Sequence, residues 1–339
     1  MNKQKIRTEL EHILYKALER KALSRQEAAW LIREVDPLSY EMYTLMGAAN
    51  QITRETSGNR GEIHAQIGVN IAPCPHNCGF CSFATEAGLF KERLEMSPGE
   101  VVDCAKRFVA EGANVIYLMT TGKYNFDKLL ELSEIVRGSI PAEIPLVANI
   151  DDFGLDEAKQ LAEVGFQGAY HVVRMGEGRD TRIPPERRLA TMRAILEAGL
   201  RLAYCVEPIG PEHTIEEIVE KIFIGKEYGV WFSGAMRRIP VTGTPLGKRG
   251  ALTEVELAKV VAVTRLVMGD SVISNCTHEP NSPSLLAGAN LLWAESGSNP
   301  RDLKEETNKG RGLTAAQCGQ LQREMGYEVL GGAPASFSR

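Results

Sequence analysis

Apolar, strand-like runs alternate with amphipathic helical stretches from residue 64 to about residue 325, and this alternation constrains the fold more than any other feature. Strands that alternate with helices favour a parallel sheet covered by helices. Eight such units are enough to close a barrel, so we predict an α/β fold, a (β/α)8 TIM-type barrel. The predicted strands are 64–72, 114–120, 145–150, 168–174, 201–207, 231–238, 271–276 and 289–295.

The helices predicted between these strands begin and end at recognisable signals. Ser97 is followed three residues later by Glu100, which is the pattern of a capping box, and Gly112 ends that helix. Pro185 opens another helix, which Gly199 ends. The remaining predicted helices are 126–138, 155–164, 214–228, 253–268, a short one near 282–287, and 314–325.

Residues 1–60 precede the first predicted strand and have helical patterns. Ser24 and Glu27 form a second capping-box pattern, and Gly58 ends a later helix. We therefore predict three parts. They are a helical extension over 1–60, the barrel over 61–330 and a C-terminal tail over 331–339. The extension is expected to pack on the barrel, and a partner-binding arm is the alternative.

The composition excludes several classes of function. The 339 residues are 43% apolar and 24% charged, which is ordinary for a globular protein, and the net charge of −5 opposes nucleic-acid binding. No run of about 18 apolar residues occurs, and residues 1–22 are charged throughout. We predict neither a membrane span nor a signal peptide. Seven cysteines without a secretory signal indicate a reducing cytoplasm, where metal binding is commoner than disulfides.

Three of the cysteines stand together at the end of the first predicted strand. Cys74, Cys78 and Cys81 form a C-x3-C-x2-C run. Three thiolates this close hold a soft metal or an iron–sulfur cluster better than they fill a core. A structural zinc site with His76 as fourth ligand is the alternative, but zinc sites usually combine two short-spaced pairs. A cubane cluster has one more iron than this run has cysteines, so one iron would stay open to another ligand.

With Phe80 before its last cysteine, the run resembles the motif of the radical S-adenosylmethionine (SAM) superfamily. The resemblance implies that Cys74, Cys78 and Cys81 bind a [4Fe–4S] cluster and that the amino and carboxylate groups of SAM chelate the open iron. It further implies that reduction cleaves SAM to methionine and a 5′-deoxyadenosyl radical. That radical abstracts hydrogen from a substrate.

The loops after the strands of such a barrel build the active site, so polar residues there are candidates for binding SAM. By resemblance, the segment after the second strand binds SAM's amino group. An arginine or a glutamate after the fourth strand suits SAM's carboxylate or ribose, with local salt bridges as the alternative. The residue that packs on adenine follows the fifth strand. The candidates are Phe80, Thr120, Thr121, Gly122, Arg174, Glu177, Glu207 and Ile209.

Five more residues are candidates for binding substrate or for a second site: His171, Cys205, Arg238, Cys276 and His278. His171 alternates with apolar neighbours and therefore points into the barrel, either as a ligand or as a satisfied core histidine. Cys205 and Cys276 lie on the fifth and seventh predicted strands. The alternative is that both are small apolar fillers. No catalytic residue is predicted.

Two further segments, Arg238–Leu246 and Ala287–Asn290, resemble the biotin synthase-like group of this superfamily. The group includes biotin synthase, the [FeFe]-hydrogenase maturase and methylornithine synthase. The runs GEGRDT, EPIGPEHT and NPRDLKEETNKGRG resemble a subgroup associated with [Fe]-hydrogenase cofactor genes. The second and third strands end in Met119-Thr120 and Asn149–Asp151, where biotin synthase carries cysteines for a second cluster. Biotin synthesis is therefore not expected.

Together these resemblances imply an anaerobic, cytoplasmic enzyme of cofactor or small-metabolite biosynthesis. Its partners would be a small-molecule substrate and an external electron donor of the flavodoxin or ferredoxin type. One alternative is sulfur insertion of the biotin or lipoyl type, with a second sulfur source at Cys205 and Cys276. Another is a non-catalytic iron–sulfur carrier or scaffold, which would need no cavity. The charged segment Asn299–Gly312 is either a lid over the barrel mouth or a surface loop.

Overall fold

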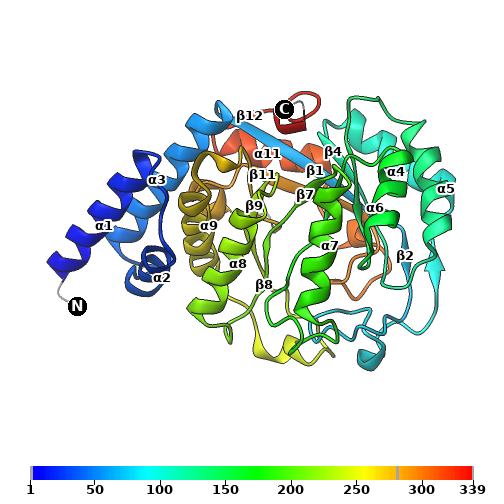
Figure 1. The fold of residues 1–339 in the computed structure, drawn as a ribbon, viewed down its shortest axis with the longest axis horizontal. Helices are drawn as coiled ribbons and strands as arrows, with labels where there is room; N and C mark the ends of the chain where they lie inside the picture. Colours follow the sequence, from blue (N-terminus) through cyan, green and yellow to red (C-terminus); the bar gives the residue numbers. More distant parts are fainter. Residues whose placement is uncertain (1–2, 280–281, 338–339) are drawn as a thin grey trace.

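The computed structural model describes residues 3–279 and 282–337, so the ends of the predicted extension (1–2) and tail (338–339) lie outside the described residues. Parallel strands form the centre and helices surround them (Figure 1). The strands of the main sheet are β1 (Arg60–Gly68), β4 (Val115–Met119), β5 (Leu146–Asn149), β6 (Gly168–Tyr170), β7 (Arg201–Ala203), β8 (Val206–Ile209), β9 (Ser233–Arg237), β10 (Asn275–Cys276) and β11 (Leu291–Gly297).

The main sheet closes on itself. Its strand order is β7-β6-β5-β4-β1-β11-β10-β9-β8, and the two end strands are consecutive pieces of one chain segment. Only Tyr204 and Cys205 separate those pieces, and the amide of Trp231 donates to the carbonyl of Leu202 at 2.8 Å just before β9. The eight strand positions therefore form the predicted (β/α)8 barrel. A short strand, β12 (Glu328–Val329), adds to the start of β1.

Helices cover the outside of the barrel at the predicted places. The capping box of Ser97 and Glu100 forms, and Pro185 opens its helix as expected. Of the helices in the described part of the chain, none is long and apolar enough to cross a membrane. The outer helices are α4 (Pro98–Ala110), α5 (Phe126–Arg137), α6 (Leu155–Glu163), α7 (Pro185–Glu197), α8 (Ile215–Glu227), α9 (Glu254–Met268), α10 (Ser282–Leu286) and α11 (Ala315–Glu324).

Three N-terminal helices pack beside α8 and α9, at the left of Figure 1. They are α1 (Lys3–Leu18), α2 (Arg25–Glu34) and α3 (Tyr40–Ser57). The predicted capping box of Ser24 and Glu27 forms, and Gly58 ends α3 in the left-handed conformation. Lys259 of α9 donates to the carbonyls of Ile32 and Val35 at 2.7 and 3.0 Å, which ties the extension to the barrel.

Some strand predictions were wrong in extent. The first strand is shifted to Arg60–Gly68, and a short antiparallel pair, β2 (Asn70–Ile71) and β3 (Leu94–Glu95), follows it. The strand predicted over 201–207 is broken into β7 and β8. Of the strand predicted over 271–276, only β10 forms. The Arg265 side chain donates to the carbonyls of Val272 and Ile273 at 2.9 and 3.4 Å. Those carbonyls are bonded to a side chain instead of a neighbouring strand.

Aromatic side chains fill the N-terminal half of the barrel around a buried histidine. The Nδ1 of His64 lies 2.9 Å from the hydroxyl of Tyr117, and its Nε2 lies 3.2 Å from Glu62. Its ring stacks on Trp231 with centroids 5.1 Å apart, and Trp293 packs edge-on at 5.5 Å. This layer fills the N-terminal half of the barrel, and a cavity lies toward the C-terminal ends of the strands.

Candidate functional site

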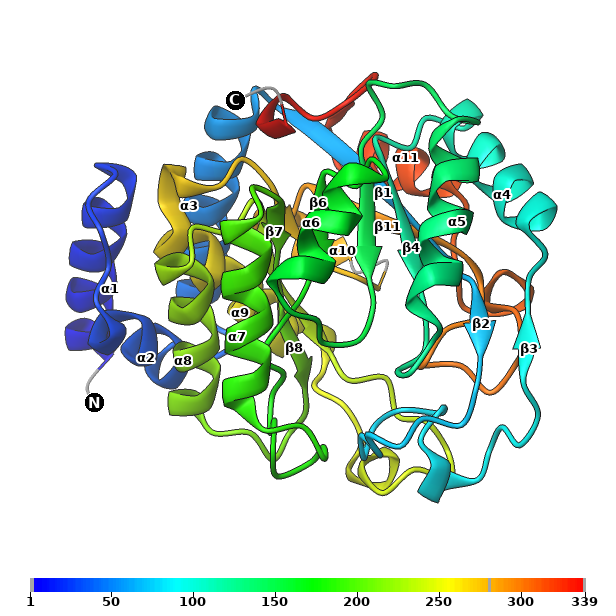
Figure 2. The same cartoon turned by 45° about the vertical axis from the view of Figure 1, so that its right-hand side comes forward.

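A cavity opens at the C-terminal end of the barrel, where the loops after the strands meet. In Figure 2 the cysteine loop, between β2 and β3, lies below the strands beside the loop after β9. Side chains from most of the strand ends line the cavity together with this loop. The lining includes Gln66, Cys74, His76, Cys78, Phe80, Cys81, Phe83, Met119, Thr120, Thr121, Gly122, Asn149, Asp151, Tyr170, Arg174, Arg188, Glu207, Met236, His278, Trp293, Pro300 and Arg301.

Backbone hydrogen bonds fix the cysteine loop to itself and to distant loops. The Cys74 amide donates to the Phe83 carbonyl at 2.7 Å and closes the loop. At its tip, Gly79 donates to the Asp180 carbonyl at 2.7 Å and accepts from the Leu246 amide at 2.8 Å. The loop is therefore held by the segments that follow the fourth and sixth strands of the barrel.

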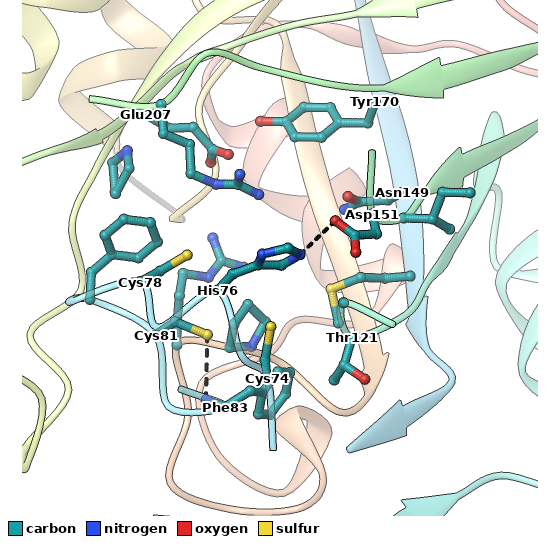
Figure 3. Close-up of a pocket in the computed structure, with 18 of the residues that line it drawn as sticks. Cys74, His76, Cys78, Cys81, Phe83, Thr121, Asn149, Asp151, Tyr170 and Glu207 are labelled. Atoms are coloured by element: carbon teal, nitrogen blue, oxygen red, sulfur yellow. Dashed lines mark hydrogen bonds and ion pairs between the residues drawn. The ribbon is translucent and has the colours of Figure 1, made fainter. Parts of the chain in front are cut away.

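All three predicted cysteines face one shared space (Figure 3). Burial raises the pKa of Cys74 and Cys81, and raises that of Cys78 to about 11. No three His, Cys, Asp or Glu side chains among the described residues are arranged to hold a single metal ion. Thiolate sulfur is the ligand type that iron–sulfur clusters take, and three sulfurs with an open side fit a cubane that keeps one iron free. Binding iron would displace the thiol protons.

The segment after β4 presses closely on this loop. A Cβ added to Gly122 would lie 2.9 Å from Cys74 Sγ and 2.7 Å from His76 Cδ2, so a close approach requires glycine there. Thr121 is fixed in turn, because its amide and its hydroxyl both bond the Asn70 side chain, at 2.9 and 2.8 Å. Thr120, Thr121 and Gly122 all line the cavity.

His76, considered as a fourth metal ligand, pairs with a carboxylate instead. Its Nε2 lies 2.7 Å from Oδ1 of Asp151 (Figure 3). Burial works against the ionised form of Asp151, but the hydrogen bond and charge of His76 outweigh it and lower the pKa of this carboxyl well below its usual range. Asp151 therefore presents a fixed negative charge at the cavity wall. Sequence reasoning did not single it out.

Of the predicted residues after β6, one lines the cavity and the others lie behind the lining and bond to it. Arg174 lines the cavity, and so does Arg188 of α7, which was not predicted. Glu177 lies behind them, with its carboxylate 3.3 Å from Arg188 and 3.8 Å from Arg174. His171 is also behind the described lining, 2.9 Å from Asp152, and burial lowers its pKa to about 4. Glu177 and His171 thus position the arginines and not a ligand directly.

Of the candidates on the later strands, Glu207 and His278 line the cavity. Ile209 is fully buried, and it is not part of the described lining. Arg238 is buried against Glu212 and donates to the Gly250 carbonyl at 2.9 Å.

The sulfurs of Cys205 and Cys276 contact each other inside the barrel, and both side chains are fully buried. Their Cα atoms are 7.4 Å apart, which is wider than an ordinary disulfide spans. The contact between these two side chains was not predicted from the sequence. It arises because the fifth and seventh strands point both side chains into the same interior layer. Neither cysteine belongs to the described cavity lining.

Part of the charged segment 299–312 forms the cavity wall. Pro300 and Arg301 line the cavity, and the Pro300 carbonyl accepts from the amide of Ser82 in the cysteine loop at 2.9 Å. Glu295 at the end of β11 bonds Arg301 at 2.5 Å and Arg311 at 3.0 Å. These two bonds hold the segment against the barrel.

A scan against models of known protein families finds no match. The chain is 28% identical over 263 residues to a biotin synthase of Pelotomaculum thermopropionicum, covering 72% of this chain and 80% of the relative. It is 26% identical over 285 residues to a biotin synthase of Desulforudis audaxviator, covering 80% of this chain and 84% of the relative.

Two solved structures share the fold. The FeFe-hydrogenase maturase HydG from Carboxydothermus hydrogenoformans superposes with a TM-score of 0.79 at 18% identity, over 96% of this chain and 80% of that chain. Methylornithine synthase (PylB) superposes with a TM-score of 0.78 at 17% identity, over 94% of this chain and 97% of that chain. The curated sequence relatives are biotin synthases, and together with the shared fold they support a place for this chain in a radical SAM, biotin synthase-like group.

Proposed function

We propose that the enzyme holds a [4Fe–4S] cluster through Cys74, Cys78 and Cys81 and binds SAM at the open iron, next to a small-molecule substrate in the same cavity. The observation that carries this proposal is that three thiols of one loop face a shielded space ringed by fixed charges. When bound, the cluster and SAM supply a carbon radical that takes hydrogen from the substrate.

The arginines after the fourth strand suit SAM's carboxylate. Arg188 is held by Asp152 at 3.1 Å and by Glu177 at 3.3 Å, so its guanidinium is already oriented when a ligand arrives. A preoriented guanidinium forms charge-assisted hydrogen bonds with little loss of side-chain entropy. We assign Arg174 the same role, with Glu207, which also lines the cavity, for the ribose hydroxyls or the amino group.

Apolar side chains would keep water from the reacting carbon. Phe80 and Phe83 come from the cysteine loop, and Met119 and Met236 from strands on either side of the barrel. A shielded cavity protects a reactive intermediate from side reactions. The enzyme would work in a reducing cytoplasm, in cofactor or small-metabolite biosynthesis, with an electron donor of the flavodoxin or ferredoxin type.

The test is anaerobic reconstitution with iron and sulfide, followed by SAM and dithionite. The wild type should form 5′-deoxyadenosine, and a variant with Ala at Cys74, Cys78 and Cys81 should lose both the cluster spectrum and this product. Cys104→Ala is the matched control, because Cys104 is a buried cysteine on α4 outside the described lining. A wild type that binds a cluster but never forms 5′-deoxyadenosine would point instead to a carrier or scaffold.

Sulfur insertion is the second candidate, favoured by the name of the sequence relatives and by the adjacent sulfurs of Cys205 and Cys276. Two protein thiols alone rarely hold a second cluster, and Met119 and Asn149 stand where the neighbouring strands end. We expect about four irons per chain, as one cubane holds. A count near six that falls to about four in Cys205→Ser would establish a second cluster.

A further inference from the structure

The cavity wall at the seventh and eighth strands carries hydrogen-bond donors far from the cysteine loop in sequence. His278 follows β10, Trp293 lies on β11 and Arg301 follows β11, and all three line the cavity. Arg301 is fixed by three bonds, from Nε to Asn299 at 3.1 Å and from Nη2 to Glu295 at 2.5 Å and to Nε2 of His278 at 2.7 Å. Its guanidinium is therefore a preoriented cation.

The contact with Arg301 determines which nitrogen of His278 carries the proton. Nε2 of His278 lies 2.7 Å from Nη2 of Arg301 and 3.2 Å from Oε1 of Glu295. Because a guanidinium can only donate, the shorter contact with Arg301 assigns Nε2 as the acceptor and places the hydrogen on Nδ1. Nδ1 is buried and has no hydrogen-bond partner within the described residues. Burial and the charge of Arg301 keep the pKa of His278 low, so the ring is neutral.

Two more buried donors stand beside this histidine. The Trp293 ring stacks on His278 with centroids 5.5 Å apart and contacts Tyr170 edge-on at 6.1 Å. Neither Trp293 Nε1 nor the Tyr170 hydroxyl makes a hydrogen bond of ordinary geometry in the described part of the chain. Figure 3 shows the Tyr170 hydroxyl turned toward Glu207. Burial and Glu207 raise the pKa of Tyr170 well above its usual value, so the hydroxyl stays protonated.

We propose that Arg301, His278, Trp293 and Tyr170 form a subsite that binds a carboxylate of the substrate, an inference that rests on the proposed radical SAM function. The four side chains present donors, and a carboxylate offers only acceptors. None of the three bonds of Arg301 uses Nη1, so this nitrogen can donate to the carboxylate. A phosphate dianion would bring a second negative charge into a cavity that Glu207 also lines.

The experiment uses the anaerobically reconstituted holoenzyme with SAM and measures binding of radiolabelled pentanoate by equilibrium dialysis, with pentanamide and inorganic phosphate as competitors. The wild type should bind pentanoate, and neither competitor should displace it. Arg301→Gln should weaken binding by about tenfold or more, which corresponds to roughly 1.4 kcal/mol. Trp293→Phe removes only the indole N–H and should weaken binding by a smaller factor.

Arg193→Gln is the matched control, because Arg193 lies on α7, bonds the Tyr228 hydroxyl at 3.3 Å on the exposed surface and is not part of the described lining. It should bind pentanoate as the wild type does. The proposal is overturned if Arg193→Gln loses as much binding as Arg301→Gln, if pentanamide or phosphate competes equally, or if the wild type does not bind pentanoate. Loss of SAM affinity in Arg301→Gln would show that Arg301 holds SAM's own carboxylate. That result would overturn the subsite and leave the proposed function standing.

Discussion

At the scale of single residues, Gly122 leaves no room for a side chain beside the cysteine loop. Replacing it with alanine would place a Cβ within 3 Å of both Cys74 Sγ and the His76 ring, so the sulfur or the loop must move. We expect Gly122→Ala to keep the fold and to lower both bound iron and the rate of 5′-deoxyadenosine formation, the latter by about tenfold or more.

Iron assays, circular dichroism and product analysis after anaerobic reconstitution would measure these effects. Gly47→Ala is the control, since no atom lies within 4 Å of the added Cβ and the residue is inside α3. That change should stabilise the fold by about 0.5–1 kcal/mol and leave iron binding intact. Equal iron contents in the two variants would contradict the close approach of Gly122 to Cys74.

His171 gives a prediction about pH. Burial lowers the pKa of His171 from 6.5 to about 4. Between these two pH values, His171 is protonated in the unfolded chain and neutral in the folded protein. The folded state therefore loses stability as the pH falls from 6.5 toward 4, by up to roughly 1.4 kcal/mol per pH unit from this residue. Above pH 6.5, His171 is neutral in both states, and its contribution to the free energy of unfolding no longer changes with pH.

Urea unfolding of the wild type and His171→Gln across that range would test this sign. Glutamine cannot titrate and can still donate to Asp152, so the variant should have the flatter pH profile. Parallel profiles for the two proteins would mean that His171 takes up a proton in the folded state.

At the scale of elements, Glu295 joins β11 to the segment that completes the cavity wall. Its carboxylate is buried and bonds Arg301 and Arg311, and it lies 3.2 Å from Nε2 of His278. Burial opposes its charge, but the charges of Arg301 and Arg311 outweigh burial and lower its pKa well below the usual value. Glu295→Gln leaves buried cations without their partner, which typically costs about 3–5 kcal/mol.

The low pKa of Glu295 also determines how the difference in free energy of unfolding between the wild type and Glu295→Gln depends on pH. The stability from ionised Glu295 is fully present above its ordinary pKa of 4.5 and is lost as the pH falls toward the folded pKa. Chemical denaturation of wild type and Glu295→Gln should therefore differ by a constant amount from pH 7 to pH 5 and converge below about 4.5. A difference that grows on acidification would contradict this account of the network.

Helices were predicted well from sequence because their ends carry local signals. The capping boxes at Ser24 and Ser97 depend on residues three apart, so neighbours in sequence specify them. Strands depend on partners far along the chain, and the seventh strand was overestimated because Arg265 of α9 takes two of its carbonyls. No local sequence pattern predicts such a contact between a side chain and the backbone of a strand.

At the scale of the whole molecule, closure of the barrel assembles the cavity from segments that no short motif connects. The cysteine run was recognisable because its three thiols lie within one loop. Asp151, Arg188 and Arg301 were missed because each becomes a wall residue only when the barrel brings its loop to the same mouth. Polar residues just after predicted strands were the available signal, and they mark too many positions to select these three.

The N-terminal helices give the last prediction, which concerns the proposed division at residue 60. Leu45 of α3 is fully buried in the same apolar core as the barrel, while Leu38, just before that helix, is 81% exposed. Leu45→Ala should destabilise the protein by about 2–5 kcal/mol, and Leu38→Ala by less than about 0.5 kcal/mol.

Because α3 packs against α9, the extension and the barrel should unfold together in one transition. Urea unfolding followed both by far-ultraviolet circular dichroism and by tryptophan fluorescence would show whether the two signals coincide. Trp30 of α2 reports on the extension, and Trp231 and Trp293 report on the barrel. If Leu45→Ala instead produces an early transition confined to the helical signal, residues 1–60 are a separate folding unit, and the barrel is stable without them.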